Sequence, residues 1–297
     1  MKLLKFIIKP FKSESSKVII LTFIIWKISL FLILSLAIIF IPLYSKHFLG
    51  GGLGNYSKNP YIFAWANFDG EHYLSIAQGG YGQLNHAFFP LYPLLINILS
   101  LKIQNIAWLI VVGLFISSIC FLIGLFLLQK LTRLDFPKSS LLTILALITF
   151  PTSFYFGALY TESLFLMLSV GAFYFARVGK WWIAGILGGL SSATRIYGIL
   201  IFPALLIDWF QNRSKYGQSY GQSNDKNFQT LLALCLIPVG FLCYIFYLYL
   251  SVGDVFVFYK ELSIFGEQRS GNLILLPQIL YRYFKMLTSV DIQNPIY

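Results

Sequence analysis

The residues best suited to chemistry gather in one stretch, residues 65–93, with the sequence WANFDGEHYLSIAQGGYGQLNHAFFPLYP. It contains Asp69, Glu71, His72 and His86 between strongly apolar segments. Carboxylates and imidazoles are the side chains that most often take or give protons in catalysis. The stretch is therefore either a site for acid–base chemistry beside a membrane or a solvated loop.

The composition indicates which kind of fold must position these residues. Of 297 residues, 58% are apolar and 11% charged, and the mean hydropathy is +0.74. A soluble fold of this length needs far more polar surface, so we expect an all-α, polytopic membrane protein. The net charge of +11 is spread over short segments beside apolar runs, which indicates membrane topology rather than a nucleic-acid partner. The three cysteines lie in apolar segments, which argues against disulfides or a cysteine metal site.

The apolar runs predict about seven membrane spans. The run at 87–101 is too short to cross and has Pro90 and Pro93 near its start, so we expect a re-entrant or interfacial helix there. The basic segment 1–17 and the amphipathic segment 272–288 are typical of surface helices. The predicted spans are 18–44, 106–128, 141–156, 164–175, two in the hairpin 181–208, and 230–250.

The distribution of basic residues gives an orientation for these spans. With the N-terminus inside, the inner segments hold 13 Lys and Arg residues and the outer segments hold seven, as the positive-inside rule requires. The first loop (45–86) and the tail (251–297) then lie on the non-cytoplasmic face, and 211–228 is a cytoplasmic loop. A site on the outer face receives no cytosolic nucleotide sugar, so an enzyme there needs an activated donor delivered in the lipid.

Four ordered blocks of sequence carry a resemblance to a known family. They are WANFDGEHYLSIAQGGY with AFFPLYPLL, FPTSFYFGALYTESLF at 150–165, GGLSSATRIYGIL at 188–200, and GDVFVFYKE at 253–261. In these blocks the chain resembles the PIG-V type mannosyltransferases, which are polytopic GT-C enzymes. The resemblance implies one GT-C-like transmembrane domain over 1–297, shortened at its C-terminus relative to most members. It also implies transfer of mannose, with inversion and no cofactor, from a polyprenyl- or dolichyl-phosphate donor to a glycan or lipid-linked acceptor.

The resemblance points to Asp69 as the base that deprotonates the acceptor hydroxyl. The alternative is that Asp69 caps a helix beginning near Glu71. Glu71 and His72 are the other candidate catalytic residues: Glu71 also fits a charge in the first turn of a helix, and His72 could orient Asp69 or bind the donor phosphate. We expect no metal, because neither His47 nor His86 falls at a helical ligand spacing from His72.

Further polar and aromatic residues are candidates for binding substrate. Arg195 would hold the donor phosphate and Glu162 would orient Tyr160 or acceptor hydroxyls, although the two could equally form a salt bridge between hairpins. The aromatic residues could stack on sugar or prenyl chain, or form an interfacial belt. Basic residues of the tail could bind phosphate or lipid headgroups, and Asp254 could bind acceptor or fix a turn. The full set is Trp65, Tyr73, His86, Tyr160, Glu162, Arg195, Asp254, Lys260 and Arg269.

Two other functions compete with this interpretation. A transporter or lipid flippase could use the same intramembrane charges to line a path, although the spans show no inverted repeat. An inactive scaffold subunit of a glycosylation complex is the third hypothesis. In each case we expect a multi-pass protein of a bacterial plasma membrane, or of the endoplasmic reticulum in a eukaryote, in contact with membrane lipids.

Overall fold

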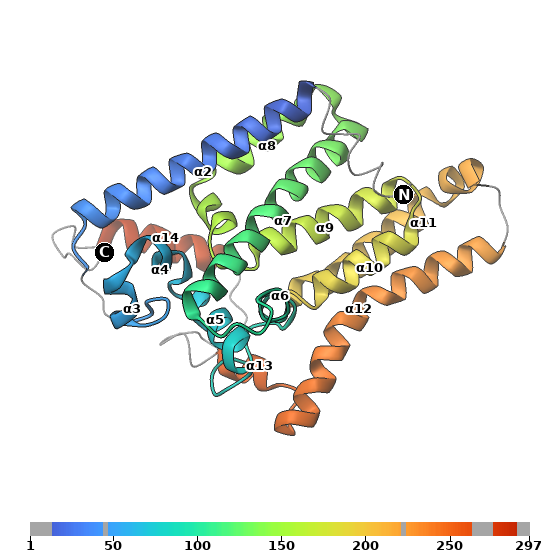
Figure 1. Cartoon of the computed structure of the whole chain (residues 1–297). Helices are drawn as coiled ribbons and strands as arrows, with labels where there is room; N and C mark the ends of the chain where they lie inside the picture. The colour runs from blue at the N-terminus through green and yellow to red at the C-terminus, as the bar shows by residue number, and fades with distance from the viewer. Residues whose placement is uncertain (1–13, 44–46, 221–223, 263–275, 290–297) are drawn as a thin grey trace.

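Helices form all the regular structure of the described chain. The computed structural model describes residues 14–43, 47–220, 224–262 and 276–289, and these ranges contain no strand. The all-α expectation is confirmed. Residues 1–13 of the predicted N-terminal surface helix lie outside the described ranges. Figure 1 shows the elements, which in chain order are α2 (Glu14–Phe40), α3 (Leu53–Lys58), α4 (Pro60–Phe63), η2 (Ala64–Ala66), α5 (Asp69–Gly79), α6 (Leu91–Leu99), α7 (Ile106–Asp135), η3 (Pro137–Ser139), α8 (Ser140–Thr149), η4 (Pro151–Gly157), α9 (Glu162–Arg177), α10 (Trp181–Ser192), η5 (Ile196–Leu200), α11 (Ile201–Tyr220), α12 (Asn224–Val252), α13 (Val257–Leu262) and α14 (Leu276–Ser289).

Within the described ranges, three helices are long and apolar enough to cross a membrane: α2, α7 and α12. A fourth candidate is the pair of helical segments Pro137–Thr149 and Pro151–Gly157, which meet at 87°. The bend occurs because Pro151 forces Phe150 into an extended conformation. The polytopic helical architecture is thus confirmed, but three or four helices meet this standard rather than about seven. The reason is that α9 and α10 have only 16 and 12 residues.

Two segments between the long helices test other expectations. Helix α6 has nine residues, too few to cross a bilayer, which agrees with the prediction that 87–101 is not a span. The segment 211–228, predicted as a cytoplasmic loop, is helical over most of its length. Helix α11 continues to Tyr220 and α12 begins at Asn224, because a polar sequence without proline can remain helical beyond an apolar run.

Helix α7 occupies the centre of the bundle. Of its most apolar stretch, 61% is buried, against 6% for the corresponding stretch of α2. Helix α2 therefore leaves most of its apolar surface for lipid. The one charge in the middle of α2, Lys27, turns inward and donates a hydrogen bond to the carbonyl of Gly157 at 3.3 Å, because a lysine directed at lipid would be costly.

Helices α10 and α12 pack with almost no space between their backbones. A Cβ on Gly185 would overlap the carbonyl of Ala233, and one on Gly240 would overlap the carbonyl of Gly189, so glycine permits the contact. Pro238 interrupts the hydrogen bonding of α12. On either side of this proline, the Ser192 hydroxyl donates to the carbonyl of Ile237 (2.6 Å) and accepts from the amide of Phe241 (3.1 Å). This serine bridges the two backbone groups.

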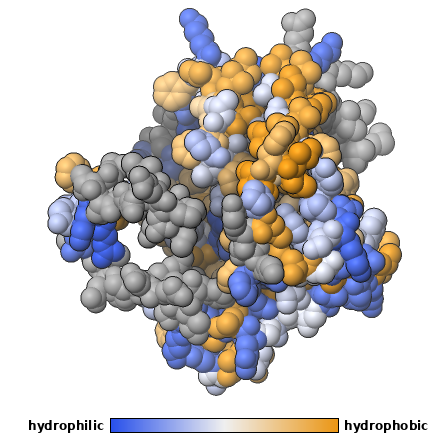
Figure 2. Space-filling view, turned by 90° about the vertical axis from the view of Figure 1, so that its left-hand side faces the viewer, coloured by the Kyte–Doolittle hydropathy of each residue, from blue (hydrophilic) through white to orange (hydrophobic). Residues whose placement is uncertain are grey.

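The ends of the helices divide the molecule into two sides. In Figure 1, α7 and α9 end, and α10 and α12 begin, toward the right-hand side, whereas α3 to α6 and α13 gather at the lower left. Figure 2 shows the left-hand face, where apolar side chains dominate above and polar ones become frequent below. The short helices with the candidate site residues therefore cover one end of the apolar bundle.

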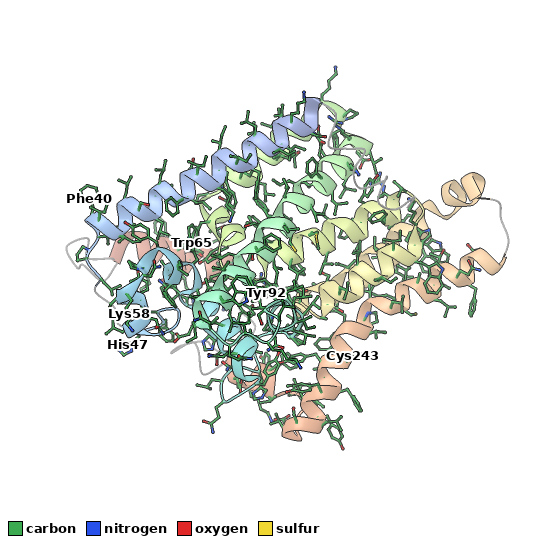
Figure 3. All side chains as sticks on the ribbon, in the orientation of Figure 1. Phe40, His47, Lys58, Trp65, Tyr92 and Cys243 are labelled. Atoms are coloured by element: carbon green, nitrogen blue, oxygen red, sulfur yellow. The ribbon has the colours of Figure 1, made fainter. Side chains whose placement is uncertain are left out.

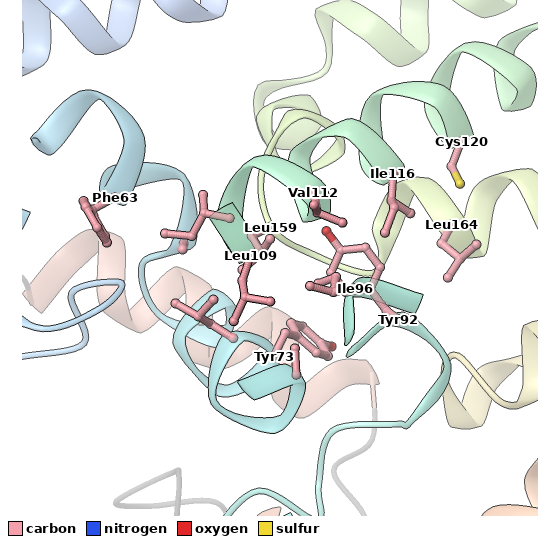
Figure 4. Close-up of a cluster of buried hydrophobic side chains, with 14 of the residues drawn as sticks. Phe63, Tyr73, Tyr92, Ile96, Leu109, Val112, Ile116, Cys120, Leu159 and Leu164 are labelled. Carbon is pink, nitrogen blue, oxygen red and sulfur yellow. The ribbon is translucent and has the colours of Figure 1, made fainter. Parts of the chain in front are cut away.

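A buried cluster joins these short helices to the bundle. It combines Tyr73 of α5, Tyr92 and Ile96 of α6, residues of α7, and Leu159 and Leu164 from the region of α9 (Figure 4). The Tyr92 side chain is fully buried, and its hydroxyl bonds to the carbonyl of Gly113 and to the Ser117 hydroxyl, at 3.0 and 2.8 Å. Packing against α7 thus fixes where α5 begins.

Candidate active site

The chain enters α5 through a tight turn at residues 67–70. Phe68 has φ 55° and ψ −122°, the conformation of the first central residue of a type II′ turn, which favours glycine. The amide of Gly70 closes the turn on the carbonyl of Asn67 at 3.1 Å. A bulky residue in this region of φ and ψ is strained by about 1–3 kcal/mol, and such strain is concentrated at functional sites. The turn sets Asp69 as the first residue of α5.

Asp69 is exposed, and α5 has no side-chain cap at its N-terminus. The alternative that Asp69 caps a helix starting near Glu71 is therefore wrong, because Asp69 is itself the first helical residue. Its charge reaches the neighbouring tyrosines. Burial raises the pKa of Tyr73 to about 12 and raises that of Tyr160 above its usual range, and in both cases the negative charge of Asp69 acts in the same direction.

Arg195 and Glu162 form an ion pair next to Asp69. The Nη2 of Arg195 lies 2.5 Å from Oε1 of Glu162, and its Nε donates to the Thr161 hydroxyl at 2.7 Å. Thr161 also lies 3.3 Å from the hydroxyl of Tyr73. The Oε2 atom of Glu162 is buried without a hydrogen-bond partner among the described residues. The structure therefore contains the salt bridge between hairpins, and 31% of the Arg195 side chain, with part of its five-donor guanidinium, stays exposed.

His72 lies one turn along α5 from Asp69, in contact with the loop that follows this helix. Its Nδ1 is 2.8 Å from Oδ1 of Asn85, and its ring stacks on Phe88 with centroids 4.5 Å apart and an interplanar angle of 15°. Glu71 is half-buried in the first turn of α5, the position where the helix dipole favours a carboxylate.

His86 lies in a separate, buried group. Its Nδ1 is 2.7 Å from Oε1 of Glu261 on α13, and its ring stacks on Tyr81. The Tyr244 hydroxyl donates to the carbonyl of His86 at 2.6 Å. His86 therefore connects the loop after α5 to α12 and α13.

The remaining candidates lie at the edges of the site. Asp254 accepts hydrogen bonds from Lys260 at 2.5 Å and from the amide of Phe256 at 2.9 Å. These bonds agree with the alternative in which Asp254 fixes a turn. The bond from Lys260 holds the pKa of the Asp254 carboxyl below its usual range. A role of this pair in substrate binding stays a prediction, and Arg269 lies outside the described residues.

Trp65 and Tyr160 connect the first loop to α9. The carbonyl of Trp65 accepts from the amide of Leu159 at 2.9 Å, and the Tyr160 hydroxyl donates to the carbonyl of Asn67 at 2.9 Å. Figure 3 shows Trp65 on the same side of the molecule as His47 and Lys58. In the described ranges no three His, Cys, Asp or Glu side chains are grouped to hold a metal ion.

The arrangement joins an exposed carboxylate, an arginine and a histidine at one end of an apolar bundle. The family model described as Mannosyltransferase (PIG-V) matches residues 15–261 of the 297. The chain belongs to this family. This mannosyltransferase is therefore a membrane glycosyltransferase, and its resemblance to the PIG-V type enzymes is confirmed. No curated protein and no solved structure matches the chain.

Sequence reasoning missed several residues that contact the candidate site residues of this mannosyltransferase. Thr161 and Asn85 are neutral side chains that contact Arg195 and His72, and their residue types gave no signal. Glu261 was placed only on the outer face, although it is buried against His86. The order of the four blocks was the one signal that could have brought Glu261 near the first loop.

Proposed function

We propose that this mannosyltransferase takes mannose from a polyprenyl-phosphate donor and transfers it, with inversion, to a hydroxyl of a lipid-linked or glycan acceptor. The observation that carries the proposal is the position of Asp69. It is exposed at the uncapped start of α5, and its charge acts on Glu162, which forms a group with Thr161 and Arg195. A carboxylate next to a cation matches a reaction in which a hydroxyl loses a proton while a phosphate leaves.

The reaction is one displacement at the anomeric carbon. The acceptor oxygen forms a bond to this carbon while the bond from carbon to the phosphate oxygen breaks. The hydroxyl proton passes to Asp69, and the electron pair of the broken bond leaves with the polyprenyl phosphate. Attack from the face opposite the leaving group inverts the configuration of the sugar.

Arg195 and His72 stabilise the leaving phosphate. The guanidinium is the stronger candidate because its fork of donors suits phosphate oxygens and 31% of its side chain is exposed. Glu162 and Thr161 hold this fork in one orientation, so little reorganisation accompanies the development of charge. His72 supplies a second contact to phosphate.

The proposed location of the site is the non-cytoplasmic face of the membrane. The basic residues of the chain support it, because the opposite ends of α7, α9 and α10 and the segment between α7 and α8 carry Lys130, Arg133, Lys138, Arg177 and Lys180, as expected on the cytoplasmic side. A donor anchored in the bilayer by its prenyl chain can reach such a site without a soluble carrier.

The test is transfer from radiolabelled polyprenyl-phosphate mannose to endogenous acceptors in membranes that contain wild type or Asp69→Asn at matched levels. We expect the variant to lose transfer by about 10²- to 10⁴-fold, the usual contribution of a general base, while it still binds donor. Asp135→Asn makes the same change at the other end of the molecule and is the matched control. Equal transfer by wild type and Asp69→Asn would exclude Asp69 as the base. Movement of donor across the bilayer without transfer by wild type would contradict the proposed reaction.

A further inference from the structure

Glu261 is a buried carboxylate that, within the described ranges, makes three hydrogen bonds to one short loop. Its Oε1 accepts from the amide of Leu84 (3.1 Å) and from Nδ1 of His86 (2.7 Å), and its Oε2 accepts from the amide of His86 (2.7 Å). Only 8% of the residue is exposed. Burial of a carboxylate is costly unless hydrogen-bond donors surround it, as they do here. Since an ionised carboxylate only accepts, the Nδ1 of His86 carries the hydrogen.

These bonds fix the backbone on both sides of Asn85. The two amides that Glu261 binds belong to the residues immediately before and after Asn85. Leu84 has φ 67°, a left-handed conformation that a leucine adopts only when its surroundings impose it. The Glu261 carboxylate supplies that constraint from 177 residues further along the chain.

Asn85 in turn fixes His72. Its Oδ1 lies 2.8 Å from Nδ1 of His72, and its Nδ2 points to the Ser75 hydroxyl at 3.5 Å. With the amide in this orientation, the Nδ1 of His72 donates to Asn85, so Nε2 is the nitrogen left to take up a proton and donate it to a phosphate oxygen. The same loop provides Phe88, on which the imidazole stacks. Both contacts that orient His72 therefore depend on the conformation of residues 81–89.

We propose that Glu261 is a positioning residue for His72: it fixes the backbone around Asn85, and Asn85 sets the tautomer and direction of the imidazole. The inference rests on the proposed function, in which His72 contacts the leaving phosphate. It goes beyond that function by assigning a task to a carboxylate that touches neither substrate nor His72.

The attachment of α13 does not depend on this carboxylate. Phe258 of α13 packs in a buried cluster with Phe89, Tyr244 and Leu248, so apolar contacts hold the helix against the loop. We therefore expect Glu261→Gln to fold. The variant keeps the size of the side chain but replaces one acceptor oxygen by an NH₂ group, which cannot accept from the Leu84 or His86 amide.

The kinetic test is a double-mutant cycle of Glu261→Gln and His72→Gln in the radiolabelled transfer assay. We expect Glu261→Gln to lower kcat by about tenfold to a hundredfold, as misplacement of a catalytic group does, with the donor KM changed less than kcat. In the His72→Gln background the same change lowers kcat no further, because the residue it positions is gone. Tyr259→Phe, on the exposed side of α13, is the local control.

Each outcome of the cycle has one meaning. A loss of equal size in both backgrounds would show that Glu261 acts on the fold and not through His72, and would overturn the inference. Full activity of His72→Gln alone would overturn both the role of His72 in the proposed function and the positioning role of Glu261. Loss in His72→Gln with none in Glu261→Gln would overturn only the positioning role.

A second measurement does not require activity. Diethyl pyrocarbonate modifies histidines, and mass spectrometry of the peptides resolves His47, His72 and His86 individually. We expect modification of His72 to be several-fold faster in Glu261→Gln than in wild type, because opening of the loop releases the ring locally, with His47 as the internal standard. An unchanged rate at His72 would overturn the inference even if the chain transferred no mannose.

Discussion

The two ends of α9 carry similar ion pairs in different surroundings. At its start, Glu162 binds Arg195 through one oxygen, and the other oxygen is buried without a hydrogen-bond partner in the described structure. At its end, Arg177 makes two bonds to Asp135, at 3.0 and 2.6 Å, and 43% of the aspartate side chain is exposed. Both pairs suit the helix dipole. The pair at the end of α9 lies near water with both carboxylate oxygens engaged, as expected of a bond that joins two helices. The pair at its start has one oxygen without a partner in the described structure and lies among the candidate site residues.

The largest loss of activity is expected at the start of α9, where Arg195 binds Glu162. Arg195→Lys retains the charge but loses the planar fork that binds Thr161 and Glu162 together. We expect kcat/KM for the donor to fall about 10²-fold, the effect of removing one donor from a developing charge. Arg177→Lys, measured in parallel, should stay within twofold of wild type. Equal losses in the two variants would remove the distinction between the ends of α9.

The second prediction concerns stability. Glu162→Gln leaves a half-buried guanidinium without its counter-charge, which should lower the free energy of unfolding by about 1–2 kcal/mol, less than the fully buried limit because both side chains are partly exposed. The unfolding midpoint in detergent measures this. A variant as stable as wild type would show that the pair contributes to the site alone.

The third prediction concerns the strained backbone of Phe68, in the turn before α5. Phe68→Gly removes a left-handed phenylalanine whose side chain is 65% exposed. Relief of strain outweighs the added freedom of glycine in the unfolded chain, so we expect about 1 kcal/mol of stabilisation. The kcat should fall because Asp69 is held less firmly. A lower unfolding midpoint would instead assign Phe68 a packing role.

The smallest effect should be at the far end. Asp135→Asn removes an exposed pair, and we expect a change in the free energy of unfolding of about 0–1 kcal/mol with unaltered transfer. The unfolding midpoint and the transfer assay, measured on the same preparation, check both. A large loss of transfer would mean that the two ends of α9 are coupled.

The site could be predicted where its chemistry is local. Asp69, Glu71 and His72 are adjacent in the sequence, and their residue types indicated acid–base work. Charges in apolar segments must find partners or water, so a salt bridge between Glu162 and Arg195 was one of two alternatives, and the structure contains it. The hydrogen bonds between Glu261 and the loop could not be predicted, because 175 residues separate Glu261 from His86 and no periodicity connects the two.

The fold was predictable in class and less so in detail. Hydropathy predicted the helical membrane bundle. It also predicted more helices long enough to cross a membrane than the described residues contain. Helices such as α10 are short, and Gly185 packs against the backbone of α12, a tertiary contact that composition does not reveal. The positive φ of Phe68 had no signal either, because an aromatic residue is atypical there.

The long separation between His86 and Glu261 has a consequence for synthesis of the protein. A ribosome adds about 5–20 residues per second, so roughly 10–35 s pass between the two residues. During that interval α5 and α6 can already pack against α7, but the loop beside His72 lacks the carboxylate that orders it. The loop beside His72 thus gains this constraint only when α13 has been made, and a chain interrupted before α13 is released without it.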